Sequence, residues 1–337
     1  MNRNSTVARA TGADAAPRAI QNESCHAEHA GKNSESGAKP ASGKRLFDRL
    51  WLMMMMPPLF WAGNAIIGRA AVGVVPPVGL AFWRWTLGAA ILLPFAWQHL
   101  RADRRVLAAH WPIVLLLTAL GVGAFNTLLY LGLRTTTAMN GVMMQSAMPV
   151  IIVLMGVAFF RDRVRSAQWL GILVSLVGAS VLISHGDPAA LLQLQFNVGD
   201  ILVFVAVVCY CAYTVLLRRR PDVHPLSFLV ATFVGGAAML FPFYLWETAS
   251  GFPMPLSLQA LGSIAYTALC ASILAYLCFN RAVALAGAGV AGLSFHLMPV
   301  FGTVLAILIL GERAQLYHGA GIALIAVGIL LVTRKSR

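Results

Sequence analysis

The same residue pattern occurs twice in this chain, about 150 residues apart, inside segments that are apolar enough to span a membrane. The two copies align without a gap from about residue 147 to 182 and continue more faintly upstream, with an offset of 148 or 149. Two copies of one membrane unit are the organisation that alternating-access transporters use. The aligned residues include Met148-Pro149-Val150 with Met298-Pro299-Val300, Asp162-Arg163 with Glu312-Arg313, Trp61 with Tyr210, and Arg69 with Arg218.

Apolar residues make up 59% of the chain and charged residues only 11%. A soluble protein of this length could not bury so much apolar surface. Runs of about 18 or more apolar residues are long enough to cross the hydrocarbon core as helices. The fold class that we predict is an all-α polytopic membrane protein with ten transmembrane helices. We expect these helices at roughly 50–70, 77–98, 111–131, 136–160, 166–184, 199–218, 225–246, 258–279, 283–309 and 314–333.

Residues 1–43 differ from the rest of the chain, because they are rich in Ser, Asn, Ala, Gly and Lys and contain no apolar run. Such a segment cannot bury enough surface to offset its ordering entropy, so we expect a disordered cytoplasmic tail. It also lacks the apolar stretch of a secretory signal peptide. The remaining chain is predicted to divide into a first five-helix repeat at 50–184 and a second at 199–333.

Lysine and arginine residues are distributed unequally between the two ends of the predicted helices. Sixteen fall on the side that holds both termini, and three fall on the other side. By the positive-inside rule, this bias places both termini in the cytoplasm and supports an even number of spans. With five spans in each repeat, the second repeat is then inverted relative to the first. These short clusters explain the net charge of +13, so we do not expect a nucleic-acid partner.

Arg84 is the sharpest single signal, because it lies about a third of the way into the second predicted span, between two tryptophans. An arginine inside a span costs about 2.5–3.5 kcal/mol on insertion scales, so it normally faces a cavity or a polar partner. Two interpretations remain open. Arg84 binds an anionic group of a substrate or the carbonyls of a broken helix, or it extends to the membrane interface beside the two Trp rings.

Pro149 and Pro299 occupy equivalent places in the fourth and ninth predicted spans. A mid-helix proline removes a backbone hydrogen bond and frees a carbonyl, which is tolerated at membrane depth only beside protein or a watery cavity. We therefore favour a polar lining of two gating helices over ordinary hydrogen bonds between helices. His296 is a proton carrier or a hydrogen-bonded packing residue. The polar residues near the two prolines are Asn140, Gln145, Ser146, Ser294 and His296.

Trp61 and Asn64 in the first predicted span align with Tyr210 and Tyr213 in the sixth, at an offset of 149. Aromatic side chains with a polar tip at this depth can line a pocket for a ring or an alkyl group, although packing explains them equally well. We predict that these four residues, together with Arg84 and the polar residues near the prolines, bind substrate. This site is expected near the membrane midplane, between the two repeats.

Several kinds of functional motif are missing from the sequence. It has no Walker motif, no nucleophile elbow and no metal-ligand spacing among its five cysteines. No Asp or Glu lies in the middle of a predicted span, so the commonest proton or sodium relay is absent. We therefore expect no cofactor, no metal and no enzymatic activity.

Short motifs occur in both halves, namely Trp61-Ala62-Gly63-Asn64, Trp83-Arg84, Pro149, Arg161-Asp162-Arg163, Gly199-Asp200, Asn280-Arg281-Ala282, Met298-Pro299-Val300, Gly311-Glu312-Arg313 and Gly319-Ala320-Gly321. Together they resemble the EamA-type family of the drug/metabolite transporter superfamily over about residues 50–333. The resemblance implies ten helices in two inverted repeats, in the bacterial cytoplasmic (inner) membrane, and usually export of small metabolites or amphipathic compounds. Arg161-Asp162-Arg163 departs from the Gly-Glu-Arg-like turn that is usual in the family, and this loop difference leaves the expectation of transport intact.

The function that we expect is that of a secondary transporter, which exports small amino-acid-like or amphipathic compounds by alternating access. A membrane channel or facilitator without ion coupling is the alternative. A membrane-embedded enzyme has less support, because the predicted spans contain no polar catalytic cluster. The expected partners are a small-molecule substrate and the lipid bilayer.

Overall fold

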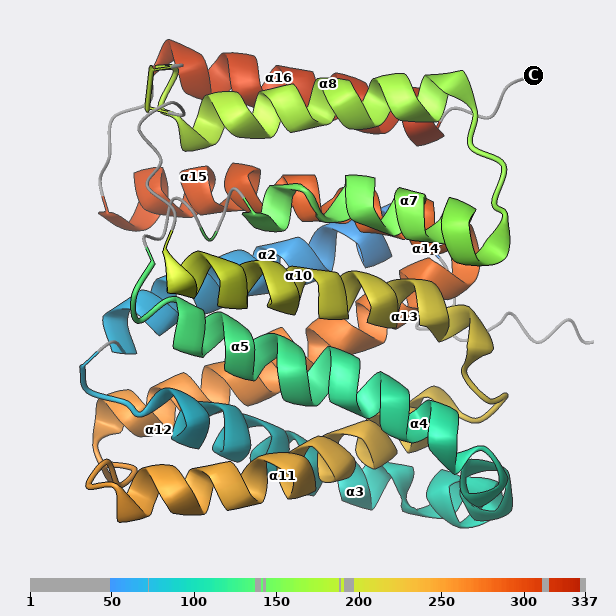
Figure 1. Ribbon diagram of the computed structural model, residues 1–337, viewed down its shortest axis with the longest axis vertical. Helices are drawn as coiled ribbons and strands as arrows, with labels where there is room; N and C mark the ends of the chain where they lie inside the picture. The colour runs from blue at the N-terminus through green and yellow to red at the C-terminus, as the bar shows by residue number, and fades with distance from the viewer. Residues whose placement is uncertain are drawn as a thin grey trace, which may run out of the picture. The chain divides into compact units, whose positions relative to one another are not determined.

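The computed structural model describes residues 49–71, 73–136, 141, 144–187, 189–190, 197–310 and 315–333 (Figure 1). All of these residues belong to one unit, which extends from residue 41 to 337. The predicted tail at 1–43 and the candidate site residue Asn140 lie outside the described residues. In the described ranges, all regular secondary structure is helical, which confirms the all-α prediction.

The helices follow the order of the predicted spans. The first repeat contains α2 (Leu50–Ala71), α3 (Pro77–Ala109), α4 (Trp111–Thr118), the π-helix η1 (Ala119–Ala124), α5 (Phe125–Gly132), α7 (Met148–Phe160) and α8 (Ser166–Ile183). The second contains α10 (Val198–Leu216), the 3-10 helix η2 (Leu217–Arg219), α11 (Pro225–Ala249), α12 (Leu258–Tyr266), the π-helix η3 (Thr267–Leu274), α13 (Ala275–Ala286), α14 (Ala288–Gly292), the 3-10 helix η4 (Leu293–His296), α15 (Leu297–Leu310) and α16 (Leu316–Thr333).

Seven helical segments in the described part of the chain are long and apolar enough to cross a membrane, and two further apolar helices, α7 and α16, are shorter. This finding supports a multi-pass membrane protein. The seven segments are Pro77–Ala109, Trp111–Gly132, Ser166–Ile183, Val198–Arg219, Pro225–Ala249, Leu258–Ala286 and Ala288–Leu305.

Two helices extend well beyond their predicted ends. Helix α3 continues beyond residue 98 to Ala109, because no Gly or Pro lies between residue 98 and the turn at His110. Pro112 then occupies the first turn of α4. Helix α13 likewise extends to Ala286. It ends there because Gly287, with φ of 82°, adopts a conformation that other residues rarely take.

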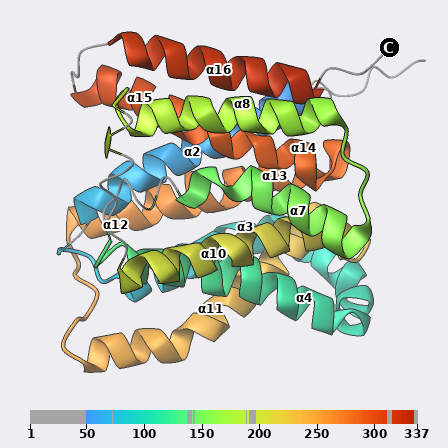
Figure 2. The same ribbon diagram turned by 45° about the horizontal axis from the view of Figure 1, so that its top comes forward.

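Helices of one repeat pack mainly against helices of the other (Figures 1 and 2). In the first repeat α5 and α7 pack on α10, and in the second α13 and α15 pack in the same way on α2. Two further pairs, α3 with α11 and α8 with α16, join equivalent helices. Exchanging the two repeats therefore leaves the packing scheme unchanged.

The pair α8 and α16 is held at very short range by glycines. A Cβ added to Gly171 would lie 2.5 Å from the carbonyl oxygen of Gly328, and a Cβ added to Gly178 would lie 2.8 Å from that of Gly321. Only glycine allows two helix backbones to approach so closely. Because the earlier glycine of α8 meets the later glycine of α16, these equivalent helices run antiparallel.

Candidate functional site

Arg84 lies in the first third of α3, and its side chain is 1% exposed. The guanidinium donates four hydrogen bonds to neutral acceptors that come from both repeats. The interpretation of Arg84 as an interfacial anchor is therefore wrong, because its polar end is directed into the protein. The four bonds run from Nε to Ser272 Oγ (2.8 Å), from Nη1 to Asn126 Oδ1 (3.0 Å) and Tyr130 OH (3.0 Å), and from Nη2 to the Ala271 carbonyl oxygen (3.2 Å).

The two tryptophans beside Arg84 lie in different environments. Trp85 is fully buried, and its ring centroid lies 4.6 Å from the Arg84 Cζ atom. This distance allows a cation–π interaction, which is stronger where water is excluded. Trp83 is 38% exposed and points outward. Trp85 thus helps to hold the cation, whereas Trp83 occupies the outer surface of α3.

A π-helix makes the Ala271 carbonyl available as an acceptor. In η3 the wider turn interrupts the usual α-helical hydrogen bonds, and the Ala271 oxygen accepts bonds from Arg84 and from Trp61 Nε1 (3.1 Å). The first repeat has the π-helix η1 at the equivalent position, where the Gly121 oxygen accepts a bond from Tyr276 OH (2.5 Å). Both π-helices were absent from the sequence prediction. The sequence feature that could have indicated them is the abundance of small residues in both segments.

The predicted aromatic residues come together where α2 meets α10. The rings of Trp61 and Tyr210 have centroids 5.8 Å apart in an edge-on arrangement, and Trp61 stacks on Phe295 at 5.4 Å. Tyr210 contacts Tyr213 at 5.3 Å. Because Trp61 and Tyr210 are equivalent residues of the two repeats, this cluster lies where the repeats meet.

Asn64 and Tyr213 connect these aromatics to polar side chains. Tyr130 OH donates to Asn64 Oδ1 at 3.4 Å, and the same hydroxyl oxygen accepts a bond from Arg84. Tyr213 OH donates to Asn280 Oδ1 at 2.9 Å. The structure thus brings Arg84, Trp61, Asn64, Tyr210 and Tyr213 into one network, although Asn126, Tyr130 and Ser272 were missed as its members.

Several buried polar atoms in this region have no hydrogen-bond partner among the described residues. They include Asn280 Nδ2 and Ser294 Oγ, whereas Asn126 and Tyr210 interact with the Tyr276 side chain. A buried polar group without a partner costs about 1–3 kcal/mol, so such groups are uncommon and often mark a site for water or ligand. The position of Asn280 and Ser294 beside the aromatic cluster favours a ligand site here.

His296 forms a second polar contact between the repeats, and it is fully buried. Its Nδ1 lies 2.6 Å from Ser175 Oγ, and its Nε2 lies 2.9 Å from the carbonyl oxygen of Ser146. A carbonyl can only accept, so Nε2 carries the hydrogen and Nδ1 accepts from the serine hydroxyl. This geometry supports the interpretation of His296 as a hydrogen-bonded packing residue.

Pro149 does not lie in the middle of a helix, which corrects the prediction for that residue, whereas Pro299 lies inside the helical segment Ala288–Leu305. Pro149 is in the first turn of α7, after a turn at Ala147, and Pro299 is the third residue of α15, after the 3-10 helix η4. In a first turn the missing N–H has no intrahelical partner to lose, so proline is tolerated there. A turn at Ala147 interrupts the helix just before Pro149, and the tighter 3-10 helix η4 leads directly into α15 just before Pro299. Gln145 precedes the turn at Ala147 and donates from Nε2 to the Gly141 carbonyl oxygen at 3.2 Å.

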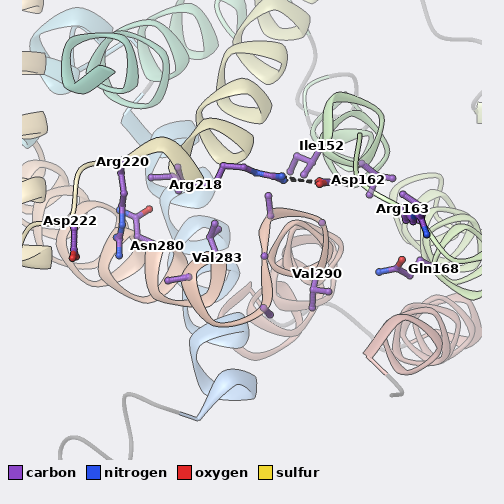
Figure 3. A pocket seen from close by; sticks show the side chains of 18 of the residues that line it. Ile152, Asp162, Arg163, Gln168, Arg218, Arg220, Asp222, Asn280, Val283 and Val290 are labelled. Carbon is purple, nitrogen blue, oxygen red and sulfur yellow. Dashed lines mark hydrogen bonds and ion pairs between the residues drawn. The ribbon is translucent and has the colours of Figure 1, made fainter. Parts of the chain in front are cut away.

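A cavity of about 620 Å³ lies at one end of the helices, between the α7–α8 loop, the end of α10 and the α13–α14 turn (Figure 3). Charged side chains from both repeats line it, including Asp162 and Arg218. The predicted site residues do not line this cavity. Asn280 does, and it accepts the hydrogen bond from Tyr213, so the cavity adjoins the aromatic network. Among the described residues, no group of three His, Cys, Asp or Glu side chains could hold a metal ion.

Comparison with known proteins gives the family. The sequence profile of the EamA-like transporter family matches residues 50–184 and again residues 197–334. The chain belongs to the EamA-like transporter family. The two matches coincide with the two predicted repeats within a few residues, so the transporter carries two copies of the family's unit.

Relatives with known sequences are also named as transporters. The transporter is 26% identical over 282 residues to "Uncharacterized transporter YyaM" of Bacillus subtilis, which covers 83% of this chain and 92% of that protein. It is 29% identical over 301 residues to an "Uncharacterized transporter" of Methanothermobacter thermautotrophicus, which covers 84% and 86% of the two chains. A solved structure entitled "Crystal structure of protein" has the same fold, with a TM-score of 0.68, 18% identity, and coverage of 84% of this chain and 96% of that one.

Proposed function

We propose that this EamA-like protein is a secondary transporter of the bacterial inner membrane that exports small metabolites bearing a carboxylate, by alternating access. In this proposal ten spans form two inverted five-helix repeats, both termini are cytoplasmic, and substrate binds between the repeats. Substrates are amino-acid-like or amphipathic, because the Arg84 site adjoins aromatic rings.

The packing of equivalent helices supports the inversion of the repeats. Helices α8 and α16 are equivalent and run antiparallel. Helices α3 and α11 do so as well, since Glu247 near the end of α11 accepts hydrogen bonds from the N–H groups of Val78 and Gly79 at the start of α3. Equivalent helices that run in opposite directions are expected for repeats related by an axis in the membrane plane.

The environment of Arg84 is the observation that carries the proposed substrate class. A fully buried guanidinium is bound from both repeats by neutral acceptors only. A carboxylate that displaces one of these acceptors would accept charge-assisted hydrogen bonds from Arg84, and such bonds are about twice as strong as neutral ones. It would also neutralise a cation that is costly at this depth.

A chain of contacts connects the cavity to Arg84. Asn280 lines the cavity and binds Tyr213, whose ring contacts Tyr210, and Tyr210 contacts Trp61. Trp61 and Arg84 then share the carbonyl oxygen of one residue of η3. The positive-inside rule puts the cavity on the cytoplasmic side, because Arg218 and its neighbours lie on the arginine-rich side. This is the side from which an exported substrate enters.

The test is transport by the purified protein in proteoliposomes. Vesicles are loaded with an equimolar mixture of the twenty amino acids, and mass spectrometry follows their exchange against the labelled mixture outside. We expect saturable exchange of a subset of the amino acids. Arg84→Lys keeps the charge but loses the planar fork, so it should exchange weakly, and Arg84→Ala should be nearly inactive. Arg105→Gln, an exposed change on the same helix, is the matched control and should leave exchange unchanged.

Two outcomes would overturn parts of the proposal. Unchanged rate and affinity in folded Arg84→Ala protein would remove Arg84 from the site. Flux that does not saturate and far exceeds about 10³ per second, the upper range of typical turnover, would favour a channel. Each variant is first compared with the wild type in thermal unfolding, so that a folding defect is recognised.

A further inference from the structure

Asp162 and Arg218 form a two-pronged ion pair between the repeats, at the edge of the cytoplasmic cavity (Figure 3). Arg218 donates from Nη1 to Asp162 Oδ1 at 2.9 Å and from Nη2 to Oδ2 at 2.7 Å. Asp162 lies in the loop after α7 in the first repeat, and Arg218 lies in η2 at the end of α10 in the second. The pair therefore joins the ends of two helices that belong to different repeats.

The backbone around Asp162 aims its carboxylate at Arg218. Arg161 ends α7 in the left-handed conformation, with φ of 54°, and its N–H binds the carbonyl oxygen of Val157 at 3.0 Å. The N–H of Asp162 then returns to the carbonyl of Gly156 at 3.2 Å. A Cβ on Gly156 would lie 2.6 Å from Asp162 Oδ2, so glycine leaves the room that the carboxylate occupies. The end of α7 therefore positions the Asp162 carboxylate against the last turn of this helix.

Arg218 is held on its other face as well. Its Cζ lies 4.1 Å from the ring centroid of Phe160, the last residue of α7. A guanidinium that both stacks on a ring and binds a carboxylate with two parallel bonds has a defined geometry. Both partners of Arg218 lie at the end of α7, so the interaction specifically connects α7 to α10.

This connection between α7 and α10 is weaker than the one between the equivalent helices α3 and α11. The Asp162 and Arg218 side chains are 40% and 32% exposed, and an exposed ion pair contributes little to stability. In contrast, α3 and α11 are joined at both ends, by Glu247 with Gly79 and by Asp103 Oδ2, which accepts from the N–H of His224 at 3.0 Å. The ion pair can therefore break without loss of the fold.

We propose that the Asp162–Arg218 pair is a reversible latch that holds α7 against α10 and restricts the cytoplasmic entrance of the transport route. Opening the latch widens the cavity towards Asn280 and Tyr213, which lead to the aromatic network. The role of the latch in transport rests on the proposed function. Its opening and closing do not, because they can be measured without a substrate. Hydrogen bonds from Arg218 hold the pKa of Asp162 below its usual value, so the carboxylate stays ionised through the physiological range.

The experiment measures access to the cavity without any substrate. Val283 of α13 is buried and lines the cavity, so Val283→Cys in a background free of the five native cysteines reports its opening. Inside-out vesicles are treated with a membrane-impermeant maleimide, and the labelling rate is compared between variants. Asp162→Asn and Arg218→Gln should each raise this rate about two- to fivefold, the population shift expected from loss of an exposed ion pair.

Two further variants make the test specific. The exchanged pair Asp162→Arg with Arg218→Asp should return the rate towards that of the parent. Asp222→Asn removes the same charge from another residue of the cavity wall and should leave the rate unchanged. An unaltered rate in both single variants, or equal acceleration in Asp222→Asn, overturns the latch.

Transport assays on the same variants separate the latch from the proposed function. Faster labelling in a protein that exchanges no amino acid leaves the latch intact and removes the proposed substrate class. Saturable exchange in a protein whose labelling rate does not change when Asp162 or Arg218 is replaced leaves the proposed function intact and overturns the latch. The free energies of unfolding of Asp162→Asn and Arg218→Gln should lie within about 1 kcal/mol of that of the parent, because both side chains are partly exposed.

Discussion

The imidazole Nε2 of His296 binds the carbonyl oxygen of Ser146 at 2.9 Å, and these two residues are equivalent positions of the two repeats, 150 residues apart. Trp61 and Tyr210, also equivalent, have ring centroids 5.8 Å apart. A residue contacts its own equivalent only near the axis that relates the copies. Both contacts therefore lie near that axis, which is where the proposed alternating-access mechanism puts the substrate.

Replacing His296 should destabilise the protein. His296→Ala removes the N–H that the buried Ser146 carbonyl accepts and leaves the Ser175 hydroxyl only its contact with the Ile172 carbonyl, at a cost of about 1–3 kcal/mol. His296→Gln can restore one of the two bonds and should have an intermediate effect. Thermal unfolding in detergent measures both variants, and the exposed His110→Ala is the control. Equal unfolding temperatures for the His296 and His110 variants would contradict the assignment.

Two glycines of α16 should differ in how their replacement by alanine changes the stability of the protein, because their neighbours differ. Gly328→Ala places a Cβ 2.4 Å from the carbonyl oxygen of Gly171, so α8 and α16 must separate, and we expect a loss of about 1–3 kcal/mol. Gly319→Ala meets no atom within 4 Å in the same helix and should be neutral or stabilising by up to about 1 kcal/mol. Thermal unfolding of the two variants gives the comparison. A similar loss in both would mean that the close approach is not what matters.

The sequence was sufficient to predict the repeat, the apolar helices and the proximity of several site residues. The offset of 149 made Trp61 and Tyr210 equivalents, and their contact follows if both lie near an axis between inverted copies. The cost of a charge at membrane depth predicted a polar partner for Arg84. These conclusions depend on properties of single residues and on periodicity, which a sequence displays directly.

The remaining features depend on how helices approach one another. Ser272 and Asn126 bind Arg84 because a π-helix and a crossing helix from different repeats present them at one point, and residue type alone does not indicate either. The same holds for Pro149, which begins a helix instead of interrupting one. Its position was misjudged because an apolar run does not show where the backbone turns at Ala147.

Arg161 occupies the position that is a glycine in the second repeat, and we expect this arginine to lower the stability of the protein measurably. Arg161 adopts a φ of 54°, in the left-handed region where a side chain costs about 1–2 kcal/mol and glycine is favoured. Arg161→Gly should therefore raise the unfolding temperature, with a gain reduced by the greater freedom of glycine in the unfolded chain. Arg165→Gly, at a φ of −75°, is the control and should be neutral or destabilising. A lower unfolding temperature in Arg161→Gly would show that this side chain has a stabilising contact that outweighs the strain.

The stacked pair His99 and His224 should make the protein less stable in acid. Their ring centroids lie 3.6 Å apart, and burial, followed by the charge of His99, lowers the pKa of His224, while Asp103 opposes the shift. A lowered pKa in the folded state means that this contribution is present above the ordinary pKa of about 6.5 and is lost as pH falls through the folded value. The unfolding temperature should fall between pH 7.5 and 5, by a small amount because solvent screens the pair. His99→Asn should show a smaller fall, and an identical fall would exclude the pair as its cause.

The proposed inversion of the repeats makes a prediction that does not depend on substrate. Ser250, at the end of α11, and Arg105, near the end of α3, are both exposed and lie at opposite ends of two antiparallel helices. The excess of lysine and arginine predicts that Arg105 lies in the cytoplasm and Ser250 outside. In intact cells that express a cysteine-free parent, a membrane-impermeant maleimide should label Ser250→Cys and leave Arg105→Cys unlabelled until the membrane is opened. The reverse labelling would invert the whole topology and move the Asp162–Arg218 latch to the outer face. Labelling of both in intact cells would place the ends of α3 and α11 on one side, which their antiparallel packing as two spans does not allow.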